Sequence, residues 1–447
     1  MTRMLTSDPA RQGLAAIETG EVTALLKRLL TCDTSNPPGH EAQAAAVIEE
    51  YAQANGLECR RVAADRDRPN LVVRLRGRGT GPSLGFLGHL DVVPARRQEW
   101  SMEPFAGIEK DGAIWGRGAV DMKCQVAATT VALAALARSG FEPNGDLMLL
   151  FMADEEVGAA GVGAPFFVEA PDAPRPDYLI GEGAGERLPT PNGPIYLLDH
   201  GVKASSQATL TVRGVPGDAS LAGAGASALT ELARLLLRLE RREAAIRVTK
   251  EVRPLLEAAA GSEGSPEEQL RRAEAASPAV AQLLTSLLTT VVHPTVARAE
   301  GPANAVPGRA EVTLQCIVLP GTTAEQLRAE LEEALGPGDY ELEITEPKGG
   351  LLSALGTPLH AAIENFLADH DPEARLVPSL GYGFADCHQF REAFGTVVYG
   401  FIPFRHADPE TNFGTKHGPD EHVLIEDLEF QVLAAIEIAR AVGETVH

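Results

Sequence analysis

The chain has 447 residues, of which 44% are apolar and 23% are charged, and its 39 basic and 62 acidic residues give a formal net charge of −23. This length predicts two or more domains, and the composition excludes disorder as the main state. The negative charge argues against nucleic acid or an anionic membrane as a partner, because both require a basic surface.

The N-terminus and the apolar segments show no sign of export or membrane insertion. Met1 to Gln12 contains no apolar signal segment, and the chain has no run of about 18 apolar residues. Five cysteines that are few, scattered and odd in number are typical of reduced thiols rather than of a disulfide framework. We therefore expect a soluble, cytoplasmic protein.

Apolar spacing predicts alternating helices and strands in the first part of the chain. Helices are expected over residues 21–30, 42–55 and 126–138, and strands over residues 70–75, 83–87, 146–152 and 178–180. This alternation predicts an α/β core with a mainly parallel sheet. In such sheets, ligands bind beyond the carboxyl ends of the strands.

The pattern changes near Ser205. Strands are expected over 208–212 and 311–316, and helices over 226–239, 251–276 (with a break from Gly261) and 323–335. We therefore expect a smaller α+β domain over residues 206–320. It would interrupt a discontinuous core formed by residues 1–205 and 321–447.

Polar residues follow several of the predicted strands. His89 and Asp91, the acidic run 154–156, and Glu182 each come after an apolar segment, Asp121 precedes a helix, and His417 comes late in the chain. Taken singly, each has a simple explanation, such as a hydrogen-bonded pair, a helix cap or a solvated turn. Taken together, they are ligands of the kinds that bind zinc, cobalt or manganese, and they match a two-metal hydrolytic site.

Motifs over nearly the whole chain resemble those of the M20 family of metallopeptidases and amidohydrolases. This family includes aminoacylases, acetylornithine deacetylase, succinyl-diaminopimelate desuccinylase, glutamate carboxypeptidase and several dipeptidases. The matching segments are residues 88–94 (GHLDVVP), 115–118 (WGRG), 121–123 (DMK), 154–158 (DEEVG), 304–307 (NAVP), 319–321 (LPG) and 416–418 (KHG), with Glu421.

The resemblance implies a specific metal centre. Asp121 would bridge two divalent ions, His89 and Glu182 would complete one site, and Glu156 and His417 would complete the other. The ions would be zinc, with cobalt or manganese as alternatives that use the same ligands.

The resemblance also implies a reaction, a fold and a partner. Glu155 would be the general base that takes a proton from the bridging water, and Asp91 would be the partner of His89. The fold would be a zinc-peptidase-like catalytic domain interrupted by a lid domain that forms a homodimer. The reaction would be cleavage of an amide (C–N) bond in a small acylated amine, amino acid or peptide-like substrate.

Substrate recognition departs from the family pattern. Asp218 stands where family lids usually carry a histidine, Ile317 stands where an arginine usually grips the substrate carboxylate, and Asn304 belongs to a matching motif. These changes predict a less positive pocket, suited to neutral or cationic groups or apolar amides, unless His200 or Lys203 supplies another donor.

Two other interpretations compete with an amide hydrolase of unusual specificity. One is an ordinary aminoacylase or dipeptidase whose substrates carry a free carboxylate. The other is a catalytically weak homologue that keeps the metals. Glu155 argues against the second alternative, because a site without turnover needs no free base there.

Overall fold

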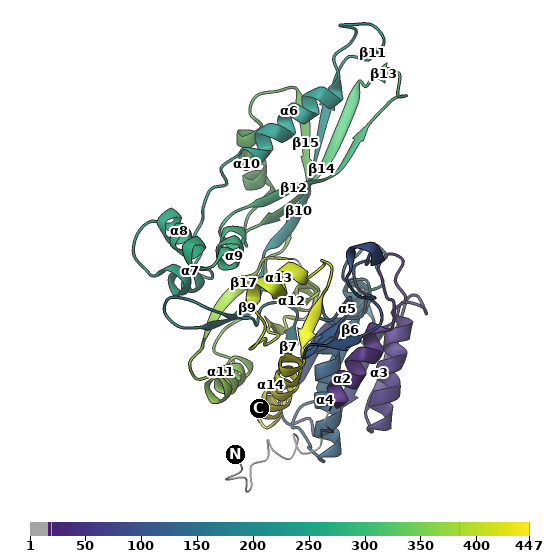
Figure 1. Ribbon diagram of the computed structural model, residues 1–447, viewed down its shortest axis with the longest axis vertical. Helices are drawn as coiled ribbons and strands as arrows, with labels where there is room; N and C mark the ends of the chain where they lie inside the picture. The colour runs from purple at the N-terminus through teal and green to yellow at the C-terminus, as the bar shows by residue number, and fades with distance from the viewer. Residues whose placement is uncertain (1–16, 19, 384, 447) are drawn as a thin grey trace.

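Two sheets of different character organise the chain in two lobes (Figure 1). The computed structural model describes residues 17–18, 20–383 and 385–446. Residues 1–12, in which no signal segment was expected, lie outside the described residues. Within the described part of the chain, no helix is long and apolar enough to cross a membrane.

The larger lobe is built on a nine-stranded sheet. Its strands are β1 (Glu58–Val62), β2 (Asn70–Leu75), β3 (Leu84–His89), β6 (Leu147–Met152), β7 (Tyr178–Gly181), β8 (Arg187–Leu188), β9 (Ile195–Val202), β17 (Arg375–Gly381) and β18 (Val397–Gly400). Their order is β1-β2-β6-β3-β7-β18-β9-β17, with β8 beside β9. The central pairings of β3 with β6 and β7, and of β18 with β7, are parallel, which confirms the predicted α/β core.

Helices cover both faces of this sheet. One face packs against α2 (Glu21–Leu30), α3 (Ala42–Ala54), α4 (Lys123–Arg138), α11 (Pro358–His370) and α14 (Ile425–Gly443). The other face packs against α5 (Ala164–Glu169) and α12 (Cys387–Phe394). Helix α4 is buried from Lys123 to Leu136 because its sequence is apolar on nearly every side. The predicted helix 21–30 and strand 70–75 match α2 and β2 residue for residue.

The small lobe, defined here as a second sheet with α6 (Ala228–Glu240) and α10 (Ala324–Leu335), projects from the larger one (Figure 1). Its strands are β10 (Ala204–Arg213), β12 (Val291–Ala299), β14 (Arg309–Val318), β15 (Tyr340–Ile344) and β16 (Lys348–Gly349). The sheet order is β12-β14-β10-β15, and β16 also pairs with β10.

The small sheet continues beyond residue 320, where the sequence analysis placed the return to the core. Strands β15 and β16 both pair with β10, and Leu342 packs in the same apolar cluster as Leu232 and Leu331. The leucine faces of α6 and α10 need this strand to close their core. We therefore place the return to the larger lobe after Gly349.

A helical insert, defined here as α7 (Arg253–Ala260), α8 (Pro266–Ala276) and α9 (Pro278–Leu288), lies between α6 and β12 in the chain. Helix α7 ends at Gly261, whose φ of 77° is readily adopted by glycine, and this is the predicted break. Leu255 and Leu284 of the insert share a buried cluster with Ile195 and Val377 of the large sheet. The insert therefore packs against the larger lobe.

Replacing Leu284 with alanine should destabilise the protein by about 2–5 kcal/mol, because this fully buried side chain would leave a cavity between the insert and the large sheet. Denaturant unfolding measures the change. The matched control is Leu221→Ala, because Leu221 is 63% exposed and its loss should change stability by less than about 0.5 kcal/mol. Equal effects of the two substitutions would show that the insert does not contribute to the core.

Candidate metal centre

Three neighbouring parallel strands deliver the candidate ligands to one edge of the large sheet. His89 is the last residue of β3, Glu155 and Glu156 closely follow β6, and Glu182 directly follows β7. Because β6, β3 and β7 are adjacent and parallel, their carboxyl ends meet at the same edge. The sequence order of strand and polar residue therefore becomes a cluster in space.

Asp121 is positioned at this edge with the help of a small three-stranded sheet. Strand β19 (His422–Leu424) pairs with β5 (Ala113–Trp115), which in turn pairs with β4 (Ile108–Lys110). This pairing brings Glu421, just before β19, against the segment that contains Asp121. The Glu421 carboxylate accepts hydrogen bonds from the backbone N–H groups of Gly118, Val120 and Asp121 at 2.7–3.0 Å.

The two histidines lie on either side of Asp121. His89 Nε2 is 3.0 Å from Asp121 Oδ1 and 3.8 Å from Glu182 Oε2. His417 Nε2 is 3.3 Å from Asp121 Oδ2 and 3.1 Å from Glu156 Oε2. These five side chains, which the resemblance names as ligands, therefore lie together at one place.

The chemistry of these donors fits divalent metal ions. His89, Asp121 and Glu156 offer ligand atoms within 4.8 Å of one another, and so do His89, Glu155 and Glu182. The Glu156 Oε1 atom is buried and has no hydrogen-bond partner, which a buried carboxylate oxygen rarely tolerates without a cation. Imidazole and carboxylate ligands suit zinc, cobalt and manganese.

Burial and crowding of like charges shift the titration of the cluster. Burial raises the pKa of Glu155 well above its usual value and that of Glu182 to about 7. Hydrogen bonds to Asp121 and Glu156 raise the pKa of His417 to about 10. The raised pKa values of these carboxyl groups and of the histidine both indicate that positive charge would stabilise the site.

Comparison with known proteins places the chain in a family. The sequence model described as peptidase family M20/M25/M40 matches residues 85–441. The chain belongs to this family. The resemblance seen in the sequence motifs is therefore confirmed.

Curated M20 relatives match part of the chain. A succinyl-diaminopimelate desuccinylase of Cereibacter sphaeroides (strain KD131 / KCTC 12085) is 34% identical over 221 residues, covering 48% of this chain and 55% of the relative. That of Rhodospirillum rubrum is 36% identical over 213 residues, covering 43% and 50%. The alignments thus span about half the length of these relatives.

Solved structures share the M20 fold over nearly the full chain. The metallo-carboxypeptidase Sso-CP2 from Sulfolobus solfataricus has a TM-score of 0.71 at 18% identity, covering 95% of this chain and 99% of that one. The dipeptidase Dug1p from Saccharomyces cerevisiae has a TM-score of 0.74 at 15% identity, covering 98% and 100%. At these identities the likeness establishes the fold.

Asp91 was expected to contact His89, and it also contacts the loop that carries Glu155 and Glu156. His89 Nδ1 is 2.9 Å from the Asp91 backbone carbonyl and 3.7 Å from its carboxylate, so the carbonyl is the nearer partner. The carboxylate accepts hydrogen bonds from the backbone N–H groups of Glu155 and Glu156, at 3.2 and 3.1 Å, and from the Asn36 side chain at 2.8 Å. Asp91 therefore orients both the histidine and the acidic loop.

A buried ionic network that sequence reasoning missed supports the start of this loop. Arg68 pairs with Glu41 at 2.6 Å and with Asp154 at 3.4 Å, and all three side chains are buried. Asp154 adopts a φ of 59° and also accepts a hydrogen bond from Asn36. Spacing in the sequence gave no signal for these partners, because Glu41 and Arg68 come from segments far from residue 154.

The three predicted substrate contacts do not line the metal centre of their own chain. Asp218 and Asn304 lie together where β11 (Gly217–Asp218) pairs with β13 (Ala305–Val306), at the far end of the small lobe (Figure 1). Asp218 is exposed and accepts hydrogen bonds from Ser220. Ile317 lies within β14, opposite Ser205.

The alternative donors considered in the sequence analysis have other partners. His200 Nδ1 lies 3.1 Å from the Ser353 carbonyl. The Lys203 ammonium donates to the carbonyls of Ser286 and Thr289, at 2.6 and 2.7 Å, near the carboxyl end of α9. Neither side chain lines the pocket at the metal centre.

A pocket of about 410 Å³ opens onto the metal centre. Besides Asp121, Glu155, Glu156, Glu182 and His417, its walls include Glu186, Leu197, Asp199, Leu283, Leu380, Tyr382, Phe413 and Lys416. Burial alone would lower the pKa of Lys416, but Glu186 and other carboxylates raise it above its usual value. Lys416 is therefore a cation inside the pocket, and it belongs to a matched motif without having been assigned a role.

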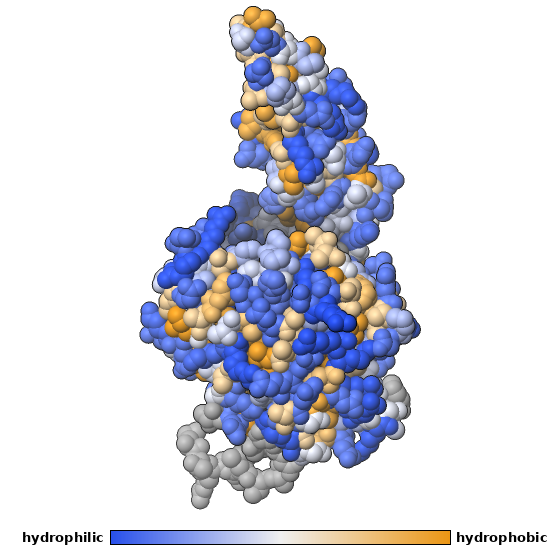
Figure 2. All heavy atoms as spheres, turned by 90° about the vertical axis from the view of Figure 1, so that its right-hand side faces the viewer, coloured by the Kyte–Doolittle hydropathy of each residue, from blue (hydrophilic) through white to orange (hydrophobic). Residues whose placement is uncertain are grey.

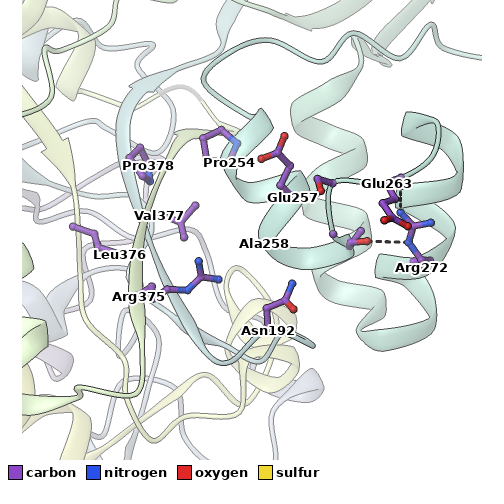
Figure 3. Close-up of a pocket in the computed structure, with 13 residues that line it drawn as sticks. Asn192, Pro254, Glu257, Ala258, Glu263, Arg272, Arg375, Leu376, Val377 and Pro378 are labelled. Carbon is purple, nitrogen blue, oxygen red and sulfur yellow. Dashed lines mark hydrogen bonds between the residues drawn. The ribbon is translucent and has the colours of Figure 1, made fainter.

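A larger cavity, of about 1090 Å³, lies elsewhere, between the insert and the edge strand β17 (Figure 3). Arg375 of β17 and Asn192 line it, while Arg272 on the insert donates hydrogen bonds to the carbonyls of Ala260 and Glu263. Its walls contain no histidine or cysteine among the described residues. The smaller pocket is therefore the candidate active site.

Replacing Glu421 with glutamine should weaken metal binding about 10- to 100-fold, because the amide NH₂ would face the backbone N–H groups that now hold the Asp121 segment. Metal content after dialysis against a graded chelator measures the effect. The control is Glu426→Gln, since the Glu426 side chain is 75% exposed and away from the centre. Unchanged metal content in Glu421→Gln would rule out this role.

Proposed function

We propose that the chain is a hydrolase that depends on two divalent metal ions and cleaves an amide bond of a small acylated amine, amino acid or peptide-like substrate. The observation that carries this proposal is the placement of Asp121 between two histidines, with Glu156 and Glu182 beyond them, at the mouth of a pocket. Zinc is the proposed metal, and cobalt or manganese would use the same ligands. When bound, such ions polarise a carbonyl and lower the pKa of water.

Each side chain has a proposed task. Asp121 offers one oxygen to each histidine side of the centre, so it is the proposed bridge between the ions. His89 with Glu182, and His417 with Glu156, are the proposed ligands of the two individual sites. The Asp91 contacts to His89 and to the backbone of the acidic loop keep these ligands in place.

Glu155 is the proposed general base. It lines the pocket, and its backbone N–H is held by Asp91, which fixes the loop that carries it. Its neighbour Glu156 points to His417, so the two adjacent glutamates can divide ligation and proton transfer between them. Glu155 would accept a proton from the attacking water and deliver it to the leaving nitrogen.

The names of these relatives support the proposed class of bond. Those matched in sequence are named succinyl-diaminopimelate desuccinylases, and those matched in structure are named a metallo-carboxypeptidase and a dipeptidase. Removal of an acyl group from an amine and cleavage of a peptide are both hydrolyses of a C–N bond. The proposed reaction is the chemistry that these names share.

Replacing Glu155 with glutamine should lower kcat about 10²- to 10⁴-fold while the metal content stays unchanged, because the base is lost and the proposed ligands remain. Hydrolysis of a panel of acyl amides measures the effect. A chelator should abolish the parent activity, and added zinc, cobalt or manganese should restore it. The control is Glu103→Gln, at a half-exposed side chain away from the pocket. Activity that survives in Glu155→Gln would refute the proposed mechanism.

We also propose that two copies of the chain associate through the small lobe. Leu229 and Leu237 of α6 are 48% and 50% exposed, and β12 is an exposed strand at the edge of the sheet. Figure 2 shows apolar residues on the surface of this narrow projecting lobe. Apolar side chains beside an open strand edge are typical of a surface that is covered in an assembly.

Sedimentation at micromolar concentration should therefore give twice the mass of one chain. Replacing both Leu229 and Leu237 with aspartate should shift the protein towards the monomer, because a charge would be buried in the contact. The control is the same change at Leu351, which is 44% exposed and lies outside the small lobe. A parent protein that sediments as a monomer would contradict the proposed dimer.

The cysteines agree with a reducing compartment. All five are free, and all except Cys59 are buried. A cytoplasmic location stays a prediction.

A further inference from the structure

Lys416 occupies an unusual position in the candidate active site. It directly precedes the proposed ligand His417, lines the same pocket, and keeps 17% of its side chain exposed. Its ammonium lies 3.4 Å from Glu186 Oε1 and 6.0 Å from the centre of the Phe413 ring. The side chain thus lines the pocket and is held beside Glu186 and Phe413.

The charges around the pocket make this lysine distinct. Asp121, Glu155, Glu156 and Glu182 belong to the metal centre, and His417 is a proposed metal ligand. Among the described residues of the pocket wall, Lys416 is then the one cation that no metal site requires.

The ammonium of Lys416 has donors left over. The distance to Glu186 is long for a charge-assisted hydrogen bond, which is usually about 2.7–2.9 Å. Glu186 itself is buried and also contacts the Asn412 side chain at 3.4 Å. Because a lysine has three donors, at least one can point to a ligand.

The neighbouring wall is apolar. Leu197 and Leu380 come from the large sheet, Phe413 comes from α13 (Pro409–Thr415), and Leu283 comes from the helical insert. A polar group bound at Lys416 would therefore lie beside a surface suited to an aliphatic or aromatic substituent.

We propose that Lys416 is a specificity-determining residue that binds a carboxylate of the substrate, while the apolar wall holds the substituent beside it. This inference rests on the proposed amide hydrolysis and names its substrate class, which is small amides that carry one free carboxylate and an apolar side chain. Glu186 offsets part of the lysine charge, so the site suits a singly charged carboxylate better than a dianionic phosphate. Lys416 then supplies, within one chain, the positive charge that Ile317 does not.

The test compares acids with counterparts that lack the C-terminal carboxylate. Metal-loaded parent enzyme is assayed on N-acetyl-leucine and glycyl-leucine, each paired with its C-terminal carboxamide. The parent should prefer the acids about tenfold or more in kcat/KM. Lys416→Met should raise KM for the acids about 10- to 100-fold, because a charge-assisted hydrogen bond is lost, and should leave the carboxamides and kcat nearly unchanged.

Two further variants separate recognition from structure. Lys416→Arg should recover part of the preference for acids, because it restores the charge. Lys348→Met is the matched control, because Lys348 is exposed on β16 and should leave every parameter unchanged. Metal content is measured throughout, and Lys416→Met should retain the parent value if the lysine acts on the substrate.

The outcomes distinguish this inference from the proposed function. Equal turnover of acids and carboxamides by the parent, or a fall in kcat for Lys416→Met without a change in KM, would overturn the role of Lys416 and leave amide hydrolysis intact. Loss of metal from Lys416→Met would show that the lysine has a structural role. Failure of the metal-loaded parent to hydrolyse any pair would overturn the proposed function, and this inference with it.

Discussion

Crowding of buried carboxylates is the constraint on which the rest of the structure depends. Asp121, Glu155, Glu156 and Glu182 converge on one edge of the large sheet, and like charges at such distances cannot all ionise without compensation. The histidines alone do not satisfy them, since one Glu156 oxygen is left buried without a partner. The parallel strands bring the charges together, and divalent ions are the chemistry that relieves the repulsion.

A second group of carboxylates keeps this cluster in a fixed geometry. Glu421 binds the backbone before and at Asp121, and Asp91 binds the backbone of Glu155 and Glu156. Both act through backbone N–H groups, so they fix the position of each loop and leave the side chains free to face the pocket. Partners of this kind orient metal ligands and raise their affinity.

The sequence predicted the centre better than it predicted recognition, and there is a physical reason. An apolar strand that ends in a polar residue defines a place in space once its neighbours are parallel, so the strand-end positions of His89 and Glu182 could be expected from the sequence. Their assignment as metal ligands came from the family resemblance. For Asp218, the sequence provided the side-chain chemistry but no information on where the residue lies. In the fold it lies at the far end of the small lobe. The range of the small lobe was also underestimated, because pairing of β15 with β10 joins segments about 130 residues apart. Lys416 was given no role because no spacing or motif in the sequence distinguishes a substrate-binding lysine from any other lysine next to a metal ligand.

The placement of these residues separates catalysis from recognition within one chain. The strand ends carry the proposed ligands and the proposed base, whereas the pocket wall combines the large sheet with Leu283 of the insert and Lys416 beside His417. Asp218 lies at the far end of the small lobe and does not line this pocket. If Lys416 has the proposed role, Lys416 and Glu186 contribute to the charge that a substrate meets inside one chain. A change of specificity could then arise at these two positions without disturbing the strand ends that carry the proposed metal ligands.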